Sequence, residues 1–399
     1  MLGVGGGIAA YKACELLRLC TESGHSVRVV PTAAALRFVG APTWEALSGQ
    51  PVAADVWTSA DEVPHVRLGR EAELVVVAPA TADLLARAAH GLADDLLTNT
   101  LLTARCPVIF APAMHTEMWT HPATVDNVAL LRARGAIVLE PAVGRLTGAD
   151  TGKGRLPEPE EIFAVVRRVL ARGLAAPDLA GRHVVVTAGG TREPIDPVRF
   201  LGNRSSGKQG YAFARAAVAR GARVTLIAAH VGLPDPAGVD VLRVETTEDL
   251  RKATVEAAAS ADVVVMAAAP ADFRPATVAP SKIKKSSDGT APALHLVTNP
   301  DIAAELGERK RPGQVLVAFA AETASGGDAL TQGRDKLTRK RADLIVVNEV
   351  GVDRVFGAES NAAVVLGADG SSVTLTEQHK EDLADAVLDL VVARLGPAA

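Results

Sequence analysis

The chain has 399 residues, which is longer than one ordinary domain and favours two. Hydrophobic residues make up 48% and aromatic residues only 3%, a composition typical of helices packed on Val-rich strands and unlike that of a lectin or a stacking-based RNA binder. A net charge of −4 gives no reason to expect nucleic acid or an anionic membrane as a partner. Three cysteines argue against a disulfide framework, and no apolar run approaches the ~20 residues of a membrane span, so we expect a cytoplasmic protein.

The first half of the chain alternates strand and helix patterns. Continuous Val/Ile/Leu runs separated by helices are typical of a parallel sheet covered on both faces. An amphipathic helix at 158–173, with acidic residues in its first turn, closes this half. The strands are expected at 26–32, 72–80, 106–114 and 135–142, with helical stretches at 9–24 and 80–104.

The second half restarts the same pattern after a linker. Residues 362–377 resemble a hairpin with Asp-Gly in its turn, and 381–395 read as a closing helix. The further strands are expected at 183–190, 223–229, 261–269, 314–322 and 342–350. The sequence therefore predicts two doubly wound, Rossmann-like α/β domains, at residues 1–172 and 183–399, joined by a linker at 173–182.

The stretch LGVGGGIAAYKAC combines a strand end, a glycine-rich turn and a helix start. The turn begins at residue 3, which leaves almost no first strand, and we expect a missing stretch upstream. Glycines let a backbone approach a ligand closely, and helix N-termini attract phosphate. The pattern is not G-x-G-x-x-G, and no acidic residue follows the second strand, where Thr32 stands instead. A mononucleotide such as FMN therefore fits better than a nicotinamide dinucleotide; a tight turn without a ligand is the alternative.

Other polar turns follow the strands of the same sheet. The carboxyl ends of parallel strands line the binding crevice of doubly wound folds. Thr81 and Asp83 stand near a helix start after one strand, and His115 follows the next. The cofactor-binding residues expected on this edge are Gly5, Gly6, Gly7, Ile8, Thr32, Pro79, Ala80, Thr81, Asp83 and Met114.

The stretch GNRSSGKQG, residues 202–210, reads like the start of a P-loop. Gln209 stands where a P-loop needs Ser or Thr for Mg²⁺, and eleven residues, 191–201, separate the stretch from the strand expected before it. We interpret it as a phosphate-binding turn of another kind, in which Ser205, Ser206 and Gly207 open the helix at 208–221. Serine capping of the helix without a ligand is the alternative.

Several of these segments together resemble two known modules. GGIAAYKAC, VPHVRL, PATADLLARAAHGLADDLLT, PAMHTEMW and GADTGKGRLPEPEEI resemble the flavin-dependent cysteine decarboxylases. VTAGGTREPIDPVRFLGNRSSGKQG, AAAPADFRPATVAPSKIKK, FAAET and KLTRKRADLIVVN resemble a CTP-dependent ligase. The resemblance covers essentially the whole chain, in the right order. It points to the bifunctional phosphopantothenoylcysteine decarboxylase/phosphopantothenate–cysteine ligases of coenzyme A biosynthesis.

The resemblance implies two consecutive reactions. In the first, CTP activates the carboxylate of 4′-phosphopantothenate as an acyl-cytidylate with release of pyrophosphate, and the amine of cysteine displaces CMP. In the second, FMN oxidises the cysteinyl CH₂–SH to a thioaldehyde, whose C=S delocalises the charge left by CO₂. The reduced flavin then returns hydride, which gives 4′-phosphopantetheine.

For the decarboxylase half, the resemblance implies that His65 is the base that assists thiol oxidation, a role that typically contributes ~10²–10⁴-fold. His115 stands where the family has Asn and is expected to contact the substrate carboxylate. Gly148 stands where the family has a Cys that acts as proton donor, so another group or water is expected to supply that proton. Gly5 similarly replaces a usual Ser or Thr.

For the ligase half, the resemblance implies that Asn203 positions the acyl-cytidylate and that Lys282 serves catalysis. Lys282 lies with Lys284 and Lys285 in a Pro-flanked loop, for which a solvated cationic face is the plain alternative. Mg²⁺ is expected to bridge the triphosphate mainly through phosphate oxygens and water. The substrate-binding residues expected are His115, Ser205, Ser206, Gly207, Asp272, Lys282, Pro300, Asp301, Ile302, Ala303, Phe319, Lys336 and Lys340.

Two other interpretations fit part of the sequence. A flavin reductase or electron carrier explains the first half and leaves the ligase motifs without a role. A non-catalytic regulatory subunit predicts loss of the base, yet His65 is present. For assembly, the resemblance implies decarboxylase trimers with FMN between subunits, ligase dimers, and hence a homo-oligomer as large as a dodecamer.

Overall fold

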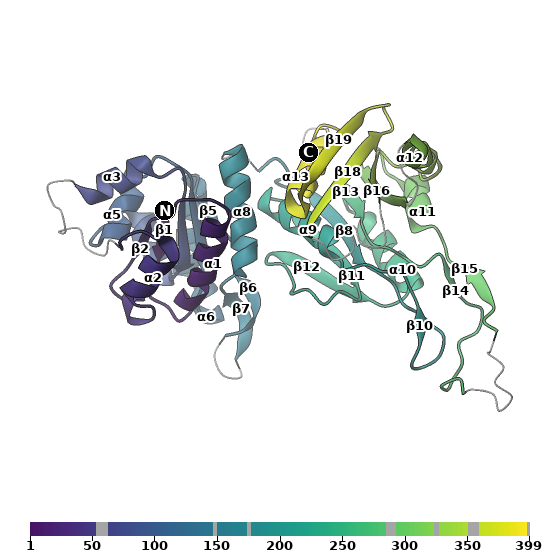
Figure 1. The fold of residues 1–399 in the computed structure, drawn as a ribbon, viewed down its shortest axis with the longest axis horizontal. Coiled ribbons are helices and arrows are strands. Elements are labelled where there is room, and N and C mark those ends of the chain that lie inside the picture. The colour runs from purple at the N-terminus through teal and green to yellow at the C-terminus, as the bar shows by residue number, and fades with distance from the viewer. Residues whose placement is uncertain are drawn as a thin grey trace. The chain divides into compact units, whose positions relative to one another are not determined.

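The structure is a computed structural model, which describes residues 1–52, 63–146, 150–173, 177–284, 293–322, 327–349 and 359–396. The chain divides into two compact units, Met1–Ala175 and Ala176–Ala399 (Figure 1). Each unit is built on a largely parallel sheet with helices on both faces, which confirms the fold class predicted from the sequence.

The first unit contains a five-stranded parallel sheet in the order β2-β1-β3-β4-β5. This is the flavodoxin-like order, in which the ligand crevice lies at the carboxyl edge where the strand order reverses. The strands are β1 Leu2–Val4, β2 Val29–Pro31, β3 Val75–Ala80, β4 Val108–Pro112 and β5 Ile137–Val138. The helices are α1 Ala10–Glu22, α2 Ala41–Ser48, α3 Pro64–Glu71, α4 Ala82–His90, α5 Leu96–Thr103, α6 Thr116–Trp119, α7 Pro122–Ala133 and α8 Pro159–Arg172, with a 3₁₀ turn at Ala35–Arg37.

Alternate residues of each buried strand pack on opposite faces of this sheet. Val76 faces a core that includes Leu16 of α1 and Ile162 of α8. Val77 faces a second core that includes Leu85 of α4 and Leu97 of α5. The period of two expected for a strand covered on both faces is therefore present.

Three local features differ from the sequence-based expectation. The first strand, β1, is short and pairs with both β2 and β3, and the glycine turn starts at Gly5 instead of residue 3. The helical stretch at 80–104 forms two helices, because Gly91 ends α4 with φ 68° and Asp95 caps α5. An antiparallel hairpin, β6 Ala142–Arg145 and β7 Thr151–Arg155, forms the flap before α8. Gly148 lies outside the described residues.

The second unit contains an eight-stranded sheet in the order β12-β11-β8-β13-β16-β17-β18-β19. It is parallel from β12 to β17, and the predicted hairpin of β18 and β19 adds two antiparallel strands. The strands are β8 His183–Gly189, β11 Arg223–Ala229, β12 Val239–Val244, β13 Val263–Met266, β16 Val315–Glu322, β17 Leu344–Glu349, β18 Ser360–Gly367 and β19 Ser372–His379.

Among the described residues of this unit, five helices cover the sheet. They are α9 Lys208–Ala219, α10 Thr247–Ala258, α11 Ile302–Arg309, α12 Gly327–Arg339 and α13 Lys380–Val392. Side chains of α9 and α13, such as Phe213 and Val387, pack in one core, and Leu250 of α10 and Leu306 of α11 pack in the other. Both loop clusters considered below follow the carboxyl ends of parallel strands in their own unit.

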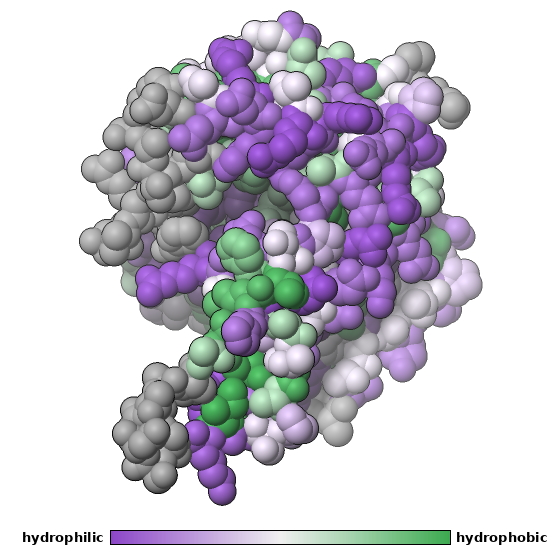
Figure 2. All heavy atoms as spheres, turned by 90° about the vertical axis from the view of Figure 1, so that its right-hand side faces the viewer, coloured by the Kyte–Doolittle hydropathy of each residue, from purple (hydrophilic) through white to green (hydrophobic). Residues whose placement is uncertain are grey.

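Two short hairpins extend from the second unit (Figure 1). They are β9 Glu193–Pro194 with β10 Phe200–Leu201, and β14 Phe273–Pro275 with β15 Leu296–Thr298. Figure 2 shows apolar surface gathered at the projecting arm of an otherwise mostly hydrophilic face. Phe200, Phe273, Leu296 and Val297 are all between 40% and 51% exposed. Within the described ranges, no helix has the length and apolar character that crossing a bilayer requires.

Candidate functional site

The loops at the carboxyl edge of the first sheet are tied together by backbone hydrogen bonds. The N–H of Gly5 donates to Pro79 (3.1 Å), that of Thr32 to Val4 (2.9 Å) and that of Ala113 to Ala80 (3.1 Å). The turns after β1, β2, β3 and β4 therefore form one continuous rim. The sheet topology brings the predicted cofactor-binding residues to this rim, and their individual roles stay predictions.

The glycines of the first turn have different neighbours. A Cβ on Gly5 would lie 2.4 Å from the carbonyl oxygen of Pro79, and one on Gly6 would lie 2.3 Å from the Cβ of Ala34. Close packing is therefore enough to explain why Gly5 and Gly6 have no side chain, without any ligand. A Cβ on Gly7 would only touch Thr81 at 3.7 Å, and Ile8 is 70% exposed. The part of the turn nearest α1 is open, which fits a flavin mononucleotide whose phosphate approaches the backbone there.

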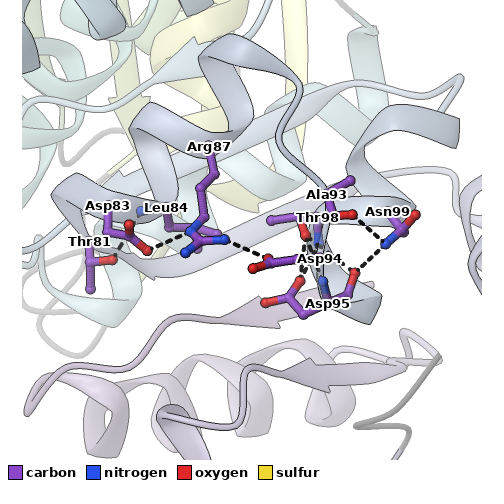
Figure 3. A network of polar contacts seen from close by, with 9 residues as sticks. All are labelled: Thr81, Asp83, Leu84, Arg87, Ala93, Asp94, Asp95, Thr98 and Asn99. Carbon is purple, nitrogen blue, oxygen red and sulfur yellow. Dashed lines mark hydrogen bonds and ion pairs between the residues drawn. The ribbon is translucent and has the colours of Figure 1, made fainter. Parts of the chain in front are cut away.

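A polar network holds the turn after β3 and the loop between α4 and α5 (Figure 3). Thr81 caps α4 by accepting from the N–H of Leu84 at 3.3 Å. Arg87 donates to Asp83 at 2.9 Å and to Asp94 at 2.6 Å, so it joins the helix to the loop. These hydrogen bonds, with that of Asp94 first, raise the pKa of Arg87. The carboxylate of Asp83 is therefore engaged by Arg87, an internal role that the sequence did not reveal.

The flap lies against the turn that carries Met114 and His115. The N–H of Met114 donates to the carbonyl of Gly154 at 2.9 Å, and a Cβ on Gly152 would lie 2.2 Å from the hydroxyl oxygen of Thr116. The exposed ring of His115 lies 3.3 Å from the carboxylate of Asp150. The flap and the predicted carboxylate-binding residue thus meet at one place.

His65 lies on α3, which packs against α5. Its carbonyl accepts from the hydroxyl of Thr103 at 2.7 Å. Its Nδ1 atom is buried and has no hydrogen-bond partner in the described part of the chain. The structure gives no hydrogen bond from His65 to the described residues of the glycine turn, and its role as a base stays a prediction.

The second unit contains a cavity of about 770 Å³ at the carboxyl ends of its parallel strands. The cavity brings together residues from distant parts of the sequence of this unit. The predicted residues that line it are Asn203, Ser205, Ser206, Gly207, Asp272, Pro300, Asp301, Ile302, Ala303, Phe319, Lys336 and Lys340.

Lys282 does not line this cavity. Its side chain is exposed, and the next residue, Ile283, is tied to the β9–β10 hairpin. The N–H of Ile283 donates to Asp196 at 3.1 Å, and its carbonyl accepts from Arg199 at 2.7 Å. The catalytic role expected for Lys282 therefore stays a prediction.

The turn before α9 is held by Gly207. This residue is the N-cap, with φ 76° and no side-chain capping bond, and its N–H donates to the hydroxyl of Ser205 at 3.3 Å. A Cβ at this position would lie 2.5 Å from a methyl carbon of Val231. The N-cap of α9 is therefore Gly207 and not a serine. The first residues of the helix line the cavity.

A buried network fixes the loop 270–272 beneath the cavity. The N–H of Ala271 donates to Thr191 at 2.9 Å, and its carbonyl accepts from the side chain of Asn299 at 2.9 Å. The backbone N–H of Asn299 donates to the carbonyl of Asp272 at 2.8 Å. The amide of Asn203 closes the arrangement by donating to the carbonyl of Pro270 at 2.8 Å. Two predicted site residues, Asn203 and Asp272, are thus held by one scaffold.

Asp301 and Lys340 form an ion pair at the cavity wall. The Nζ atom of Lys340 lies 2.7 and 2.9 Å from the two carboxylate oxygens of Asp301, which also caps α11 through the N–H of Ala304. Burial raises the pKa of Asp301, but the hydrogen bond and charge of Lys340 outweigh it, and the net pKa is lowered. Among the described residues, no group of three His, Cys, Asp or Glu side chains could hold a metal ion.

The cavity residues that the sequence analysis did not assign to the site include four polar ones, Gln209, Asn348, Asn361 and Lys380. Asn348 ends the apolar run of β17, and Asn361 stands at the start of β18. A single polar residue at the end of a buried strand was the available signal. It is weak, because strand ends commonly carry polar residues.

The sequence matches known families over both units. Residues 1–171 match the family described as "Flavoprotein", and residues 179–395 match "DNA/pantothenate metabolism flavoprotein C-terminal domain". The chain is 60% identical over 403 residues to "Coenzyme A biosynthesis bifunctional protein CoaBC" of Mycobacterium tuberculosis (strain ATCC 25618 / H37Rv), covering 99% of this chain and 96% of that one. It is 43% identical to the protein of the same name of Bacillus subtilis (strain 168), covering 98% and 96%.

Among solved structures, the C-terminal domain of a coenzyme A biosynthesis bifunctional protein CoaBC is 34% identical, with a TM-score of 0.46. The match covers 55% of this chain and 97% of that one. With the two family matches and the relatives that extend over almost the full length, the chain belongs to the family of coenzyme A biosynthesis bifunctional proteins.

Proposed function

We propose that this protein catalyses two consecutive steps of coenzyme A biosynthesis. The second unit is a phosphopantothenate–cysteine ligase that uses CTP, and the first is an FMN-dependent phosphopantothenoylcysteine decarboxylase. The observation that carries the proposal is the cavity of the second unit, which gathers twelve of the thirteen residues proposed for the ligase from distant parts of the sequence. The full-length match to bifunctional relatives supports the same assignment.

In the ligase, the polar groups of the cavity bind and align the reactants. Lys336 and Lys340 supply positive charge for CTP, and the start of α9 offers N–H groups to its phosphates. Asn203 lies on the scaffold that holds Asp272, so the amide is oriented before the substrate binds. A preoriented donor of this kind stabilises charge that develops in the transition state, and removing one costs ~10²–10³-fold in rate.

In the decarboxylase, the open end of the glycine turn at Gly7 and Ile8 would hold the phosphate of FMN. Bound there, a flavin would supply reversible hydride chemistry at the cysteinyl CH₂–SH. His65 holds the proton of the thiol through its unpartnered Nδ1 or the other ring nitrogen. His115 orients the carboxylate that leaves as CO₂, and its contact with Asp150 connects that group to the flap. The family resemblance implies that FMN lies between subunits. We therefore propose that His65 acts as the base on a substrate whose flavin is held by another copy of the chain.

We propose a homo-oligomer that works in the cytoplasm and uses Mg²⁺ with CTP. The exposed apolar arm of β14 and β15 supports contact between two copies of the ligase unit. Three free cysteines support a reducing compartment. Light scattering on the purified protein tests the assembly; a monomer at micromolar concentration would contradict it.

The function is tested by supplying 4′-phosphopantothenate, cysteine, CTP and Mg²⁺ to the purified full-length protein. Mass spectrometry is expected to show 4′-phosphopantetheine, CMP and pyrophosphate. Accumulation of phosphopantothenoylcysteine by a flavin-loaded protein would refute the decarboxylase half alone. No reaction with CTP would refute the ligase half.

A further inference from the structure

A chain of buried hydrogen bonds runs beneath the loop 270–272 of the second unit. The N–H of Ala271 donates to the hydroxyl oxygen of Thr191 at 2.9 Å, and the hydroxyl oxygens of Thr191 and Thr247 lie 2.9 Å apart. The hydroxyl and the backbone N–H of Thr247 both donate to Oε1 of Glu193, at 2.7 and 2.8 Å. All three side chains are at most 2% exposed, and they lie outside the residues that line the cavity. We call Thr191, Thr247 and Glu193 the relay.

The carboxylate of Glu193 fixes the direction of the hydrogen bonds in the relay. A carboxylate oxygen accepts, so the hydroxyl proton of Thr247 is committed to Glu193 and the oxygen of Thr247 is left to accept. The hydroxyl of Thr191 therefore donates to Thr247, while its own oxygen accepts the N–H of Ala271. Without an acceptor at residue 193, either threonine can donate to the other. Hydrogen bonds that run in one direction polarise one another, which strengthens each of them.

Glu193 is a costly residue to bury in this place. The hydrogen bonds to its carboxylate come from Thr247, a neutral residue, and no cation pairs with it in the described part of the chain. Burying a carboxylate that lacks a cation lowers stability, and an apolar side chain of similar size would fill the same space without that loss. The carboxylate therefore supplies something other than packing, and its geometry indicates that it supplies the acceptor that orders the relay.

One peptide group connects the relay to the cavity. The carbonyl of Pro270 and the N–H of Ala271 belong to the same planar, trans peptide, so they point in opposite directions. Thr191 holds the N–H on one side, and on the other side the carbonyl accepts from the side-chain amide of Asn203 at 2.8 Å. Asn203 lines the cavity. A tilt of this peptide would therefore turn the amide of Asn203.

The backbone around the relay is packed too closely to absorb such a tilt. A Cβ on Gly202 would lie 2.4 Å from the carbonyl oxygen of Thr191, and one on Gly190 would lie 2.6 Å from the carbonyl oxygen of Asn203. The segments that carry Thr191 and Asn203 are therefore in direct backbone contact. A rearrangement of the relay reaches the cavity instead of being taken up by loose packing.

We propose that Glu193 is a positioning residue of the ligase, and that it orients the side chain of Asn203 through the relay and the peptide that follows Pro270. This inference rests on the proposed ligase function and adds to it a residue that lies outside the cavity. A group held in place before the reaction stabilises the transition state, and a small misplacement costs most of that effect. The relay is therefore expected to act on kcat for ligation.

The test measures kcat for ligation, by release of pyrophosphate from CTP in the presence of 4′-phosphopantothenate and cysteine, on the full-length, flavin-loaded protein. Glu193→Met removes the acceptor, and we expect kcat to fall about ten- to a hundredfold. Glu193→Gln keeps an oxygen that accepts from Thr247, so its kcat should stay within about threefold of the wild-type value. Equal losses in the two variants would overturn the inference, because a hydrogen-bond acceptor would then not be what Glu193 supplies.

A double-mutant cycle tests the path from Glu193 to Asn203. In a protein that already carries Asn203→Ala, adding Glu193→Met should lower kcat by less than about twofold, because the group on which the relay acts is gone. Losses that multiply would show that Glu193 acts by another route, and they would overturn the inference.

Two buried threonines of α10 separate positioning from stability. Thr247→Val breaks the relay, and Thr254→Val is the matched control, at a 0% exposed threonine whose hydroxyl donates to the carbonyl of Leu250 at 2.6 Å. Both variants lose a buried hydroxyl and should lower the Tm, but only Thr247→Val should lower kcat, by about ten- to a hundredfold. A similar loss of kcat in Thr254→Val would overturn the inference, because general destabilisation would then explain both.

The wild-type protein separates this inference from the function on which it rests. A wild-type protein that releases no pyrophosphate from CTP would overturn the proposed ligase function and the inference with it. A wild-type protein that ligates, with Glu193→Met and Thr247→Val variants that match its kcat, would overturn the inference alone.

Discussion

Asn203 shows how a single side chain of the ligase cavity is prepared for its substrate. The residue is exposed, and its amide N–H donates to the carbonyl of Pro270 at 2.8 Å. That carbonyl belongs to the loop 270–272, which Thr191 and Asn299 fix from below. The remaining amide atoms of Asn203 can therefore face a substrate without the cost of ordering the side chain.

Asn203→Ala is predicted to reduce the ligation rate by about 10²–10³-fold, the usual loss for one preoriented donor. Decarboxylation of supplied phosphopantothenoylcysteine should stay within twofold, because that reaction belongs to the other unit. Steady-state rates for both reactions measure the effect. Asn127→Ala, at a surface asparagine of α7 that pairs with His90, is the control. Equal losses in the two reactions would contradict the assignment of Asn203.

At the same scale, the sequence predicted twelve of the residues that line the ligase cavity, and it missed others. Motif residues such as Asp272 and Phe319 do line it. Lys282 does not, because its loop is tied to the β9–β10 hairpin by a contact that no local pattern encodes. Asn348 and Asn361 were missed because they come from strands whose pairing had to be known before their side chains could be placed together.

Among the elements, α9 depends most strongly on one glycine. Gly207→Ala is predicted to destabilise the second unit by ~1–3 kcal/mol, the cost of a left-handed backbone in a residue with a Cβ. It should also weaken CTP binding, because Val231 lies where the new methyl group must go and the helix start would shift. Denaturant unfolding and calorimetry measure the two effects. Gly232→Ala, whose Cβ would meet nothing within 4 Å, is the control.

The first residue of β8 makes the second unit sensitive to acid. Burial and then the charge of Arg223 lower the pKa of His183, while Ser260 and Asp262 oppose this. Below the unfolded pKa of ~6.5 the unfolded chain binds more protons than the folded one, so stability falls as the pH drops. The loss should start near pH 6.5 and level off below the folded pKa.

Tm values between pH 7.5 and 5 measure this effect, and His183→Gln should make the decrease smaller. The Tm of the variant should still decrease somewhat with falling pH, because burial and the charge of Arg192 also lower the pKa of His230. An unchanged slope in His183→Gln would show that the histidine is not the source.

The sequence predicted the elements with buried, continuous patterns well. The core strands β3, β8 and β11 and the amphipathic helix α8 lie where Val runs and helical periodicity placed them. The edge strand β12 was missed, because its half-exposed residues give no continuous apolar run. The break between α4 and α5 was missed because it depends on Gly91 adopting a left-handed backbone inside an otherwise helical pattern.

For the whole molecule, each unit has its own hydrophobic cores. Trp44 is fully buried in the first unit, and Phe213, fully buried in the second, meets Phe319 edge to face at 5.7 Å. Trp44→Ala should destabilise the first unit by ~3–5 kcal/mol and reduce flavin content and decarboxylation while ligation persists. Phe213→Ala should destabilise the second unit and reduce ligation, while flavin content and decarboxylation persist. Absorbance at the flavin band measures flavin content, and the rates of ligation and decarboxylation are measured for each variant. If either variant lost both activities, the two units would not be independent.

The central claim is that two separate sites on one chain carry out two consecutive reactions. Variants His65→Asn and Asn203→Ala, each blocked in one unit, test it most directly when they are mixed. We predict that each variant alone forms 4′-phosphopantetheine from phosphopantothenate, cysteine and CTP at least about a hundredfold more slowly than the wild type, and that the mixture restores much of the rate, because the intermediate released by one variant is used by the other. A mixture that remains inactive while each variant keeps its own partial reaction would contradict the account.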